Sequence, residues 1–367
     1  MKLPQKILTG LAAFVVLATA ALALTISYTS DCGAAAAVDE GDERFQAIQF
    51  RCYGPPEVLE LTLLAKPVPK DDEVLVRVKA ASLNPLDWHY MRGSPYLIRL
   101  TTGLGAPDNQ RLGADFAGVI EAVGANVSRF KVGDAVFGTT RGSFAAYVIK
   151  HQDGSLAIMP KGASFAEAAA LPVAGITALQ ALRDHGKLQS GQHVLINGAS
   201  GGVGTYAVQI AKANGATVTG VSSERNHEML KSLGADYVID YRQTNYTDGD
   251  ARYDLIVDMI GNHPLTANLD VLQAGGRLVI VGGEKGDWIG PISNMIKQPL
   301  LSPFVDHEII VMLAQSSGDE LAALAKMMES GEIESVIDRS YALSELPAAM
   351  AYLEEGHARG KVVVEIE

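Results

Sequence analysis

The sequence predicts an α/β protein with two folded domains, one built on a doubly wound parallel sheet and one formed mainly of β-strands. Strand-like and helix-like segments alternate from about residue 166 onward. Residues 45–165 instead show short strand-like runs separated by Gly and Pro. The length of 367 residues exceeds one ordinary core and suits two domains with a short appendage.

Composition and charge exclude some classes of function. The chain is 48% hydrophobic and 20% charged, as expected for a globular protein. Its formal net charge of -12 repels phosphate backbones, and no cluster of Lys and Arg interleaved with aromatics occurs, so nucleic-acid binding is disfavoured. Cys32 and Cys52 are too few for a four-cysteine zinc lobe or a disulfide framework. We expect both cysteines to be ordinary thiols.

The first 30 residues predict a membrane anchor or a signal segment. Residues 7–26 form an apolar run of 20 residues, which as a helix would span ~30 Å. The favoured interpretation is a single-pass N-terminal anchor. Export after signal cleavage remains the alternative, because Ala21-Leu22-Ala23 resembles a cleavage site. Lys2 and Lys6 precede the run and acidic residues follow it, which by the positive-inside rule places the folded part outside the cytoplasm. The side of the membrane is left open.

Residues 31–44 are small and acidic without periodicity, which predicts a flexible linker. The all-β module is then predicted over residues 45–165, starting near Phe45. Its strand-like runs fall at residues 46–50, 73–83, 118–123, 134–138 and 144–149.

The α/β domain is predicted over residues 166–309. Its helices are expected at residues 168–188, from residue 202, and at 228–233, and its strands at 193–198, 217–222, 237–241, 253–261 and 276–283. The remaining segment, residues 310–367, contains two helical patterns and a closing strand at 361–366. We expect this tail to extend the parallel sheet and then return to complete the first domain.

A glycine-rich loop follows the first strand of the α/β domain. Residues 193–197 run into Gly198-Ala199-Ser200-Gly201-Gly202-Val203-Gly204 and then into a helical pattern. Such a strand, turn and helix exposes backbone N–H groups at a helix N-terminus, where a pyrophosphate can approach closely. The loop predicts a Rossmann dinucleotide site whose contacts come from Ala199, Ser200, Gly201, Gly202, Val203 and Gly204.

The same residues carry a resemblance to the zinc-free quinone oxidoreductase and zeta-crystallin branch of the medium-chain dehydrogenase/reductase superfamily. The resemblance extends over Gly191-Gln192, the loop above, Gln209 and Lys212, and also over residues 112–138, 171–179 and the closing GKVVV. It implies a GroES-like catalytic domain, built from residues 45–165 and 310–367, that clasps the Rossmann domain.

The residues after the second Rossmann strand favour NADPH over NADH. That strand ends in Ser222, where NAD-binding sites carry an acidic residue. Ser223 and Arg225 follow and can donate to a 2'-phosphate, although Glu224 opposes it. The resemblance adds Tyr241 beside the adenosine phosphate and Lys361 near the pyrophosphate. A surface role for Arg225 or Lys361 is the alternative.

The resemblance also implies that no metal is bound. The zinc-ligand positions of related alcohol dehydrogenases correspond here to Asn84, Ala114-Asp115 and Val173, which cannot form a zinc ligand triad. Without a Lewis acid, a quinone or a conjugated enone is the easier hydride acceptor, because its own π system spreads the incoming charge.

The resemblance assigns further residues to the reaction centre. It implies that Asn84 contacts the nicotinamide ribose or the substrate oxygen, and that Tyr96 lines the substrate site. Turn capping and core packing are their alternative roles. It places Thr177 near the carboxamide, and Gly282 and Gly283 beside the nicotinamide ring.

The sequence therefore predicts an NADPH-dependent oxidoreductase that reduces a quinone or an α,β-unsaturated carbonyl. Its alternative is a cofactor-binding, membrane-tethered interaction or sensor protein with little turnover. A homodimer is left open.

Overall fold

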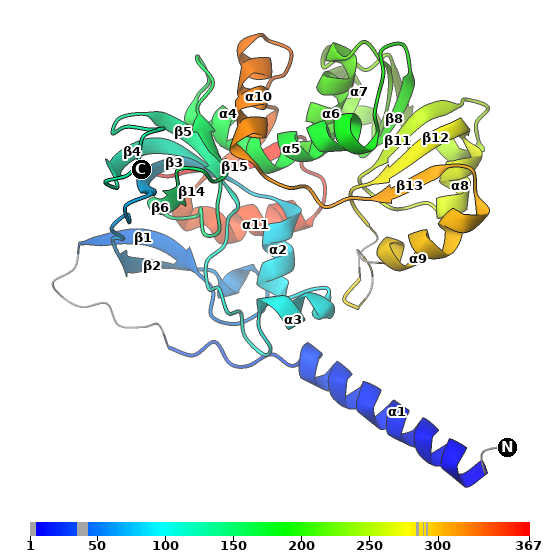
Figure 1. The fold of residues 1–367 in the computed structure, drawn as a ribbon, viewed down its shortest axis with the longest axis horizontal. Coiled ribbons are helices and arrows are strands. Elements are labelled where there is room, and N and C mark those ends of the chain that lie inside the picture. Colours follow the sequence, from blue (N-terminus) through cyan, green and yellow to red (C-terminus); the bar gives the residue numbers. More distant parts are fainter. Residues whose placement is uncertain (1–4, 35–42, 284–285, 289, 291–292) are drawn as a thin grey trace.

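Two β-sheets organise the molecule, as Figure 1 shows. The structure is a computed structural model that describes residues 5–34, 43–283, 286–288, 290 and 293–367, without the side chains of residues 5–12. One sheet has seven strands and the other has six, and a separate hairpin pairs β1 (Arg44–Gln49) with β2 (Glu60–Ala65).

The seven-stranded sheet combines strands from both ends of the chain. Its order is β14-β15-β3-β4-β5-β7, and β6 pairs with β3. β3 (Glu73–Ser82) is long enough to pair with β6 over its first half and with β15 over its last residues. The remaining strands are β4 (Asp115–Val123), β5 (Ala135–Thr139), β6 (Tyr147–His151), β7 (Leu156–Ile158), β14 (Ile337–Ala342) and β15 (Lys361–Glu365). The C-terminal segment thus returns to the first domain.

The six-stranded sheet is parallel throughout, in the order β10-β9-β8-β11-β12-β13. Such a sheet is covered by helices on its faces, and its strands are accordingly apolar. The strands are β8 (His193–Asn197), β9 (Thr217–Ser222), β10 (Tyr237–Asp240), β11 (Tyr253–Asp258), β12 (Leu272–Ile280) and β13 (Glu308–Val311). The connecting helices include α6 (Gly202–Ala213), α7 (His227–Ser232), α8 (Leu265–Asp270) and α9 (Ser293–Leu301).

The helical segment between the two sheets differs from the prediction of one helix over residues 168–188. It is divided into α4 (Phe165–Ala170), α5 (Pro172–Gln180) and a π-helical turn over Ala181–His185. Pro172 lacks the N–H that a continuous helix would need, and it occupies the first turn of α5 instead. Together with α10 (Gly318–Glu329), α5 packs between the two domains, while α11 (Leu346–Glu354) packs beside β15 and α2 (Pro85–Arg92).

The N-terminal helix α1 (Gln5–Ser27) projects away from both domains (Figure 1). Within the residues that the structure describes, no helix has both the length and the apolar character needed to cross a membrane. The predicted anchor over residues 1–30 is therefore unsupported, although residues 1–4 and the side chains of residues 5–12 lie outside the description. The end of the expected span belongs instead to the folded body, because Ile26 is buried and Arg99 donates to the carbonyls of Ser27 and Tyr28.

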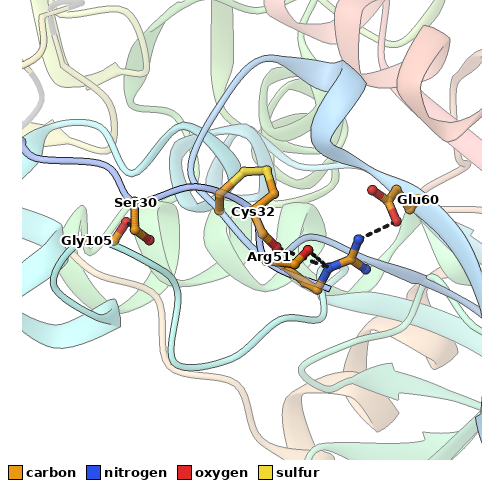
Figure 2. The surroundings of a disulfide bond; sticks show 7 residues. Ser30, Cys32, Arg51, Glu60 and Gly105 are labelled. Atoms are coloured by element: carbon orange, nitrogen blue, oxygen red, sulfur yellow. Dashed lines mark hydrogen bonds and ion pairs between the residues drawn. A yellow bond between two sulfur atoms is a disulfide. The ribbon is translucent and has the colours of Figure 1, made fainter. Parts of the chain in front are cut away.

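A disulfide joins Cys32 to Cys52, so the expectation of ordinary thiols is wrong. Figure 2 shows its surroundings. The backbone N–H and the hydroxyl of Ser30 donate to the carbonyl of Gly105, and Arg51 donates to the carbonyl of Cys32 while it pairs with Glu60. We call residues 26–33 the N-terminal arm.

The N-terminal arm corrects the predicted start of the folded part near Phe45. The first residues of the expected linker, 31–33, are fixed on the catalytic domain by the disulfide and by Arg51. Residues 35–42 of that linker lie outside the described part of the chain. Two cysteines 20 positions apart gave no sequence signal for pairing, because spacing alone does not show which segments meet in the fold.

Candidate active site

The glycine-rich loop leaves β8 at Asn197 and enters α6 at Gly202. Two of its glycines serve different purposes. A Cβ on Gly204 would lie 2.3 Å from the carbonyl oxygen of Gly198 and 2.6 Å from the backbone of Ala199, so this position allows the helix to pack closely on the loop. A Cβ on Gly201 would meet only the Gly198 oxygen, at 3.5 Å. Gly201 therefore leaves open space at the N-terminus of α6, where backbone N–H groups attract anions.

The predicted residues for the adenosine end lie where β9 and β10 terminate. The hydroxyl of Ser222 donates to the carbonyl of Ser223, and the backbone N–H of Tyr241 donates to the carbonyl of Ser222. The side chain of Tyr241 is 48% exposed. Arg225 is also exposed and uses one N–H of its guanidinium on the carbonyl of His357, which leaves its other donors toward solvent.

Asn226 connects this group to the glycine-rich loop, and sequence reasoning missed it. Its Nδ2 donates to the hydroxyls of Ser200 and Ser223, at 3.0 and 3.2 Å. Its Oδ1 is buried and has no hydrogen-bond partner within the described residues. A buried acceptor without a partner costs free energy, so it marks a place where a ligand donor fits. The only signal in the sequence was an Asn shortly after the second Rossmann strand.

Asn84 lies in a buried polar cluster with Asp115 and Lys361. Lys361 Nζ donates to Asn84 Oδ1 at 2.6 Å and to the carbonyl of Leu83 at 2.9 Å, and it lies 3.3 Å from Asp115 Oδ2. Asn84 Nδ2 donates to the same carboxylate oxygen at 2.9 Å. Lys361 is 3% exposed and Asp115 is fully buried. The side chain of Asn84 makes no capping bond to α2 (Pro85–Arg92), although its backbone begins that helix.

The cluster brings together Asn84, Asp115 and Val173, the positions that the resemblance sets against the zinc ligands of related alcohol dehydrogenases. Asp115 Oδ1 accepts a hydrogen bond from the backbone N–H of Val173, and Thr177 lies one turn further along α5 with its hydroxyl on the Val173 carbonyl. In the described ranges, no group of three His, Cys, Asp or Glu side chains could hold a metal ion. The local cation at this position is the ammonium of Lys361.

Asp87 is a second buried carboxylate beside the cluster. It accepts hydrogen bonds from the backbone N–H groups of Asn84 and Gly113. Burial raises the pKa of Asp87 to about 7, with a further increase from Asp115 that Lys361 and the two N–H donors partly offset.

This pKa predicts a pH dependence of stability. The folded-state pKa lies above the unfolded value, so between about pH 4 and 7 the folded chain binds more protons at this site than the unfolded chain does. Stability contributed by Asp87 therefore falls as pH rises through this window, by up to about 1.4 kcal/mol per pH unit. In urea unfolding from pH 4 to 8.5, Asp87→Asn should show the shallower decline. Parallel profiles for the two proteins would contradict the assignment.

Tyr96 forms an aromatic group at the edge of the domain junction. Its ring lies 5.0 Å from that of Trp288 in a T-shaped contact, and the guanidinium of Arg99 lies 4.8 Å from its centroid. Asp287, next to Trp288, accepts hydrogen bonds from the backbone N–H of Tyr96 and the hydroxyl of Ser94. Trp288 is 44% exposed and was not recognised in the sequence. These contacts link the catalytic domain to the segment that follows β12.

Gly282, predicted to lie beside the nicotinamide, is the second residue after the end of β12. A Cβ there would lie 2.0 Å from the carbonyl oxygen of Met259, so glycine is required for packing whether or not a ring lies beside it. Gly283 is half-buried next to it.

The predicted site residues fall into two groups. One cluster connects Asn84, Thr177, Gly202 and Lys361. The other end of the predicted site is formed by Ser222, Ser223, Arg225 and Tyr241.

Comparison with known proteins places these features in a family context. Two family models match the chain, the alcohol dehydrogenase GroES-like domain over residues 70–224 and the zinc-binding dehydrogenase over residues 233–364. The quinone oxidoreductase of Homo sapiens is 34% identical over 343 residues, which cover 88% of this chain and 98% of the relative.

Two solved structures share the fold. The quinone oxidoreductase from Coxiella burnetii matches with a TM-score of 0.79 and 32% identity, over 89% of this chain and 100% of that one. The quinone oxidoreductase of Escherichia coli complexed with NADPH matches with a TM-score of 0.76 and 26% identity, over 87% of this chain and 99% of that one.

Proposed function

The chain belongs to the zinc-free quinone oxidoreductase branch of the medium-chain dehydrogenase/reductase superfamily, and on this premise we propose that it transfers hydride from NADPH to a quinone or an α,β-unsaturated carbonyl. The observation that carries the proposal is the junction at Lys361. This side chain contacts Gly202 of the cofactor loop and, through its ammonium, Asn84 of the catalytic domain. The alternative of a sensor with little turnover is not favoured, because the relatives are oxidoreductases.

The described residues fit a phosphorylated dinucleotide. Gly201 leaves room at the N-terminus of α6, and the buried Oδ1 of Asn226 lacks a donor. Ser222 and Ser223 replace a carboxylate that would repel a 2'-phosphate, and Arg225 is exposed beside them. When bound, NADPH supplies the hydride and therefore both electrons.

The protein's own residues would position the acceptor and manage its charge. Hydride addition leaves negative charge on the acceptor oxygen, which needs a hydrogen-bond donor and then a proton. Asn84 offers an amide N–H from the domain junction, and Tyr96 offers a phenol that can donate a proton directly or in relay with solvent. The Asn84, Asp115 and Val173 positions do not form a zinc ligand set, because Val173 contributes only a backbone N–H and Asp115 is paired with Lys361. Delocalisation within a quinone or enone supplies the remaining stabilisation.

The proposal predicts turnover with a preference of at least about tenfold in kcat/KM for NADPH over NADH. Two added hydrogen bonds to the 2'-phosphate at ~1.5 kcal/mol each exceed the ~1.4 kcal/mol that one decade requires. Steady-state oxidation of both cofactors should be measured against a panel of quinones and enones. Arg225→Ala should remove most of the preference.

Arg252→Ala is the matched control for that experiment. Arg252 is also an exposed arginine, but it lies before β11, at the opposite edge of the parallel sheet from the ends of β9 and β10. It should leave the preference unchanged. Equal kcat/KM for NADPH and NADH in the wild type would refute the roles of Ser222, Ser223 and Arg225, and no turnover with any acceptor would refute the reductase itself.

The disulfide supports a location outside the reducing cytosol. Structural disulfides persist in oxidising compartments and are rare where thiols are kept reduced. Cys32–Cys52 therefore agrees with the charge pattern around the N-terminal apolar run, which also favours export. Thiol alkylation of the protein in intact cells, followed by mass spectrometry without reductant, should find both cysteines unlabelled. Complete labelling of Cys32 and Cys52 would place the protein in a reducing compartment.

A further inference from the structure

We propose that Lys361 is a positioning residue that fixes the amide of Asn84 for the reduction step, an inference that rests on the proposed function. Its ammonium has three N–H donors and three acceptors around it: the Leu83 carbonyl, Asn84 Oδ1 and Asp115 Oδ2. All of these groups lie within the buried cluster at the domain junction. The ammonium is thus held in place and has no free donor for a ligand.

The direction of the Asn84 amide follows from its neighbours. An ammonium can only donate and a carboxylate can only accept, so Oδ1 must face Lys361 and Nδ2 must face Asp115. One N–H of Asn84 Nδ2 donates to Asp115 Oδ2, with an N···O distance of 2.9 Å. The other has only a long contact of 3.5 Å with the carbonyl of Ser82. That second N–H is a donor of fixed direction that remains available to an acceptor oxygen.

Lys361 also connects this donor to the cofactor loop. A Cβ on Gly202 would lie 2.8 Å from Lys361 Cδ, so the aliphatic stem passes directly over the first residue of α6. The preceding residue, Gly360, donates its N–H to the carbonyl of Ser200 in the glycine-rich loop. One side chain therefore contacts the predicted phosphate site with its stem and the catalytic amide with its charge.

Single substitutions at this pair would leave one buried charge without its partner and could prevent folding. The informative variant is therefore the double substitution Lys361→Met, Asp115→Asn, which removes both charges and keeps the stem over Gly202. In this variant the methionine at position 361 cannot donate, while the new amide at position 115 can both donate and accept, so neither neighbour fixes the direction of the Asn84 amide and it is free to turn. Lys361→Arg keeps a donor-only cation beside Oδ1 and serves as the conservative variant.

The experiment compares four proteins: wild type, Lys361→Arg, Lys361→Met and the double variant. It measures their melting temperature, their affinity for NADPH by fluorescence, and their kcat and KM with one quinone and one enone. We expect the double variant to melt close to the wild type and to bind NADPH within about threefold of it, but to lose about 30-fold or more in kcat with little change in acceptor KM. Lys361→Arg should recover most of kcat.

A double variant that folds and keeps kcat within about threefold of the wild type would overturn the positioning role, because the amide would then work without the ammonium. Wild-type activity in the same assay separates this failure from a failure of the proposed function. A wild type that reduces no quinone or enone refutes the reductase, whereas an active wild type with an equally active double variant refutes only the role of Lys361.

Discussion

Gly204→Ala is expected to destabilise the apoprotein by about 3 kcal/mol or more, because the new methyl group has no space to enter. It would lie 2.3 Å from the Gly198 oxygen and 2.6 Å from the Ala199 backbone, and none of these atoms belongs to a flexible side chain. The start of α6 would have to move away from the loop that follows β8, in the middle of the parallel sheet. Urea unfolding without cofactor measures the effect, and low soluble yield is part of the expected result.

Gly201→Ala is the matched control from the same loop. Its φ of -81° suits any residue, and its Cβ would touch only one backbone oxygen at 3.5 Å. Stability without cofactor should change by less than about 1 kcal/mol, while NADPH affinity should fall about tenfold or more because the methyl group occupies the space left for the pyrophosphate. Unchanged NADPH affinity in this variant would mean that the pyrophosphate does not pass Gly201.

Arg99→Met is expected to destabilise the protein by at least about 3 kcal/mol, since hydrogen bonds to a buried charged group contribute about 1.5–3 kcal/mol each. The guanidinium donates to carbonyls at the end of α1 and to those of Gly93 and Arg92. The guanidinium also contacts two aromatic rings: it lies 4.4 Å from the ring centroid of Tyr53 and 4.8 Å from that of Tyr96. Its loss removes the hydrogen bonds to residues 26–28 of the N-terminal arm and leaves Tyr96 without a stacking partner on that side, so the acceptor KM should rise while NADPH affinity stays constant.

Arg339→Met is the matched control, because it removes an arginine–tyrosine cation–π contact at an exposed site. Its guanidinium lies 3.8 Å from the ring centroid of Tyr352, but the side chain is open to solvent. Exposed cation–π contacts contribute about 0.5–1 kcal/mol, so this control should shift the unfolding midpoint only slightly. Equal losses in the two variants would show that burial and the arm carbonyls add nothing at Arg99.

Periodicity and turn chemistry were enough to predict the parallel sheet and the glycine-rich loop. β8 and β11 are largely apolar runs bounded by turn residues, and such local patterns reflect which strand is buried. β7 was missed because three residues are too few to show a period, and β14 because its six residues mix polar and apolar side chains. The break between α4 and α5 was missed although Pro172 marks it.

The contacts that join distant segments were not predictable from the sequence. Lys361 meets Asn84 across 277 positions, and Arg99 meets Ser27 across 72. Neither contact leaves a recognisable pattern in the sequence around its two residues. Both contacts depend on how the completed sheets bring distant segments together. The apolar run at the N-terminus also has a contact that its own sequence does not reveal. Hydropathy alone suggested a membrane span, whereas the docking of its last turn depends on a buried arginine that hydropathy does not consider.

Two of the contacts between the domains differ sharply in burial. Lys361 provides the buried attachment, between Gly202 and the carboxylate of Asp115. Asp287 provides the exposed one, where it accepts from Tyr96 and Ser94 beside Trp288. Water can replace exposed hydrogen bonds at little cost, but it cannot readily replace those of a buried ion pair. The hydrogen bonds of Asp287 should therefore break more readily than those of Lys361. Local opening beside Trp288 would leave the amide of Asn84 in place.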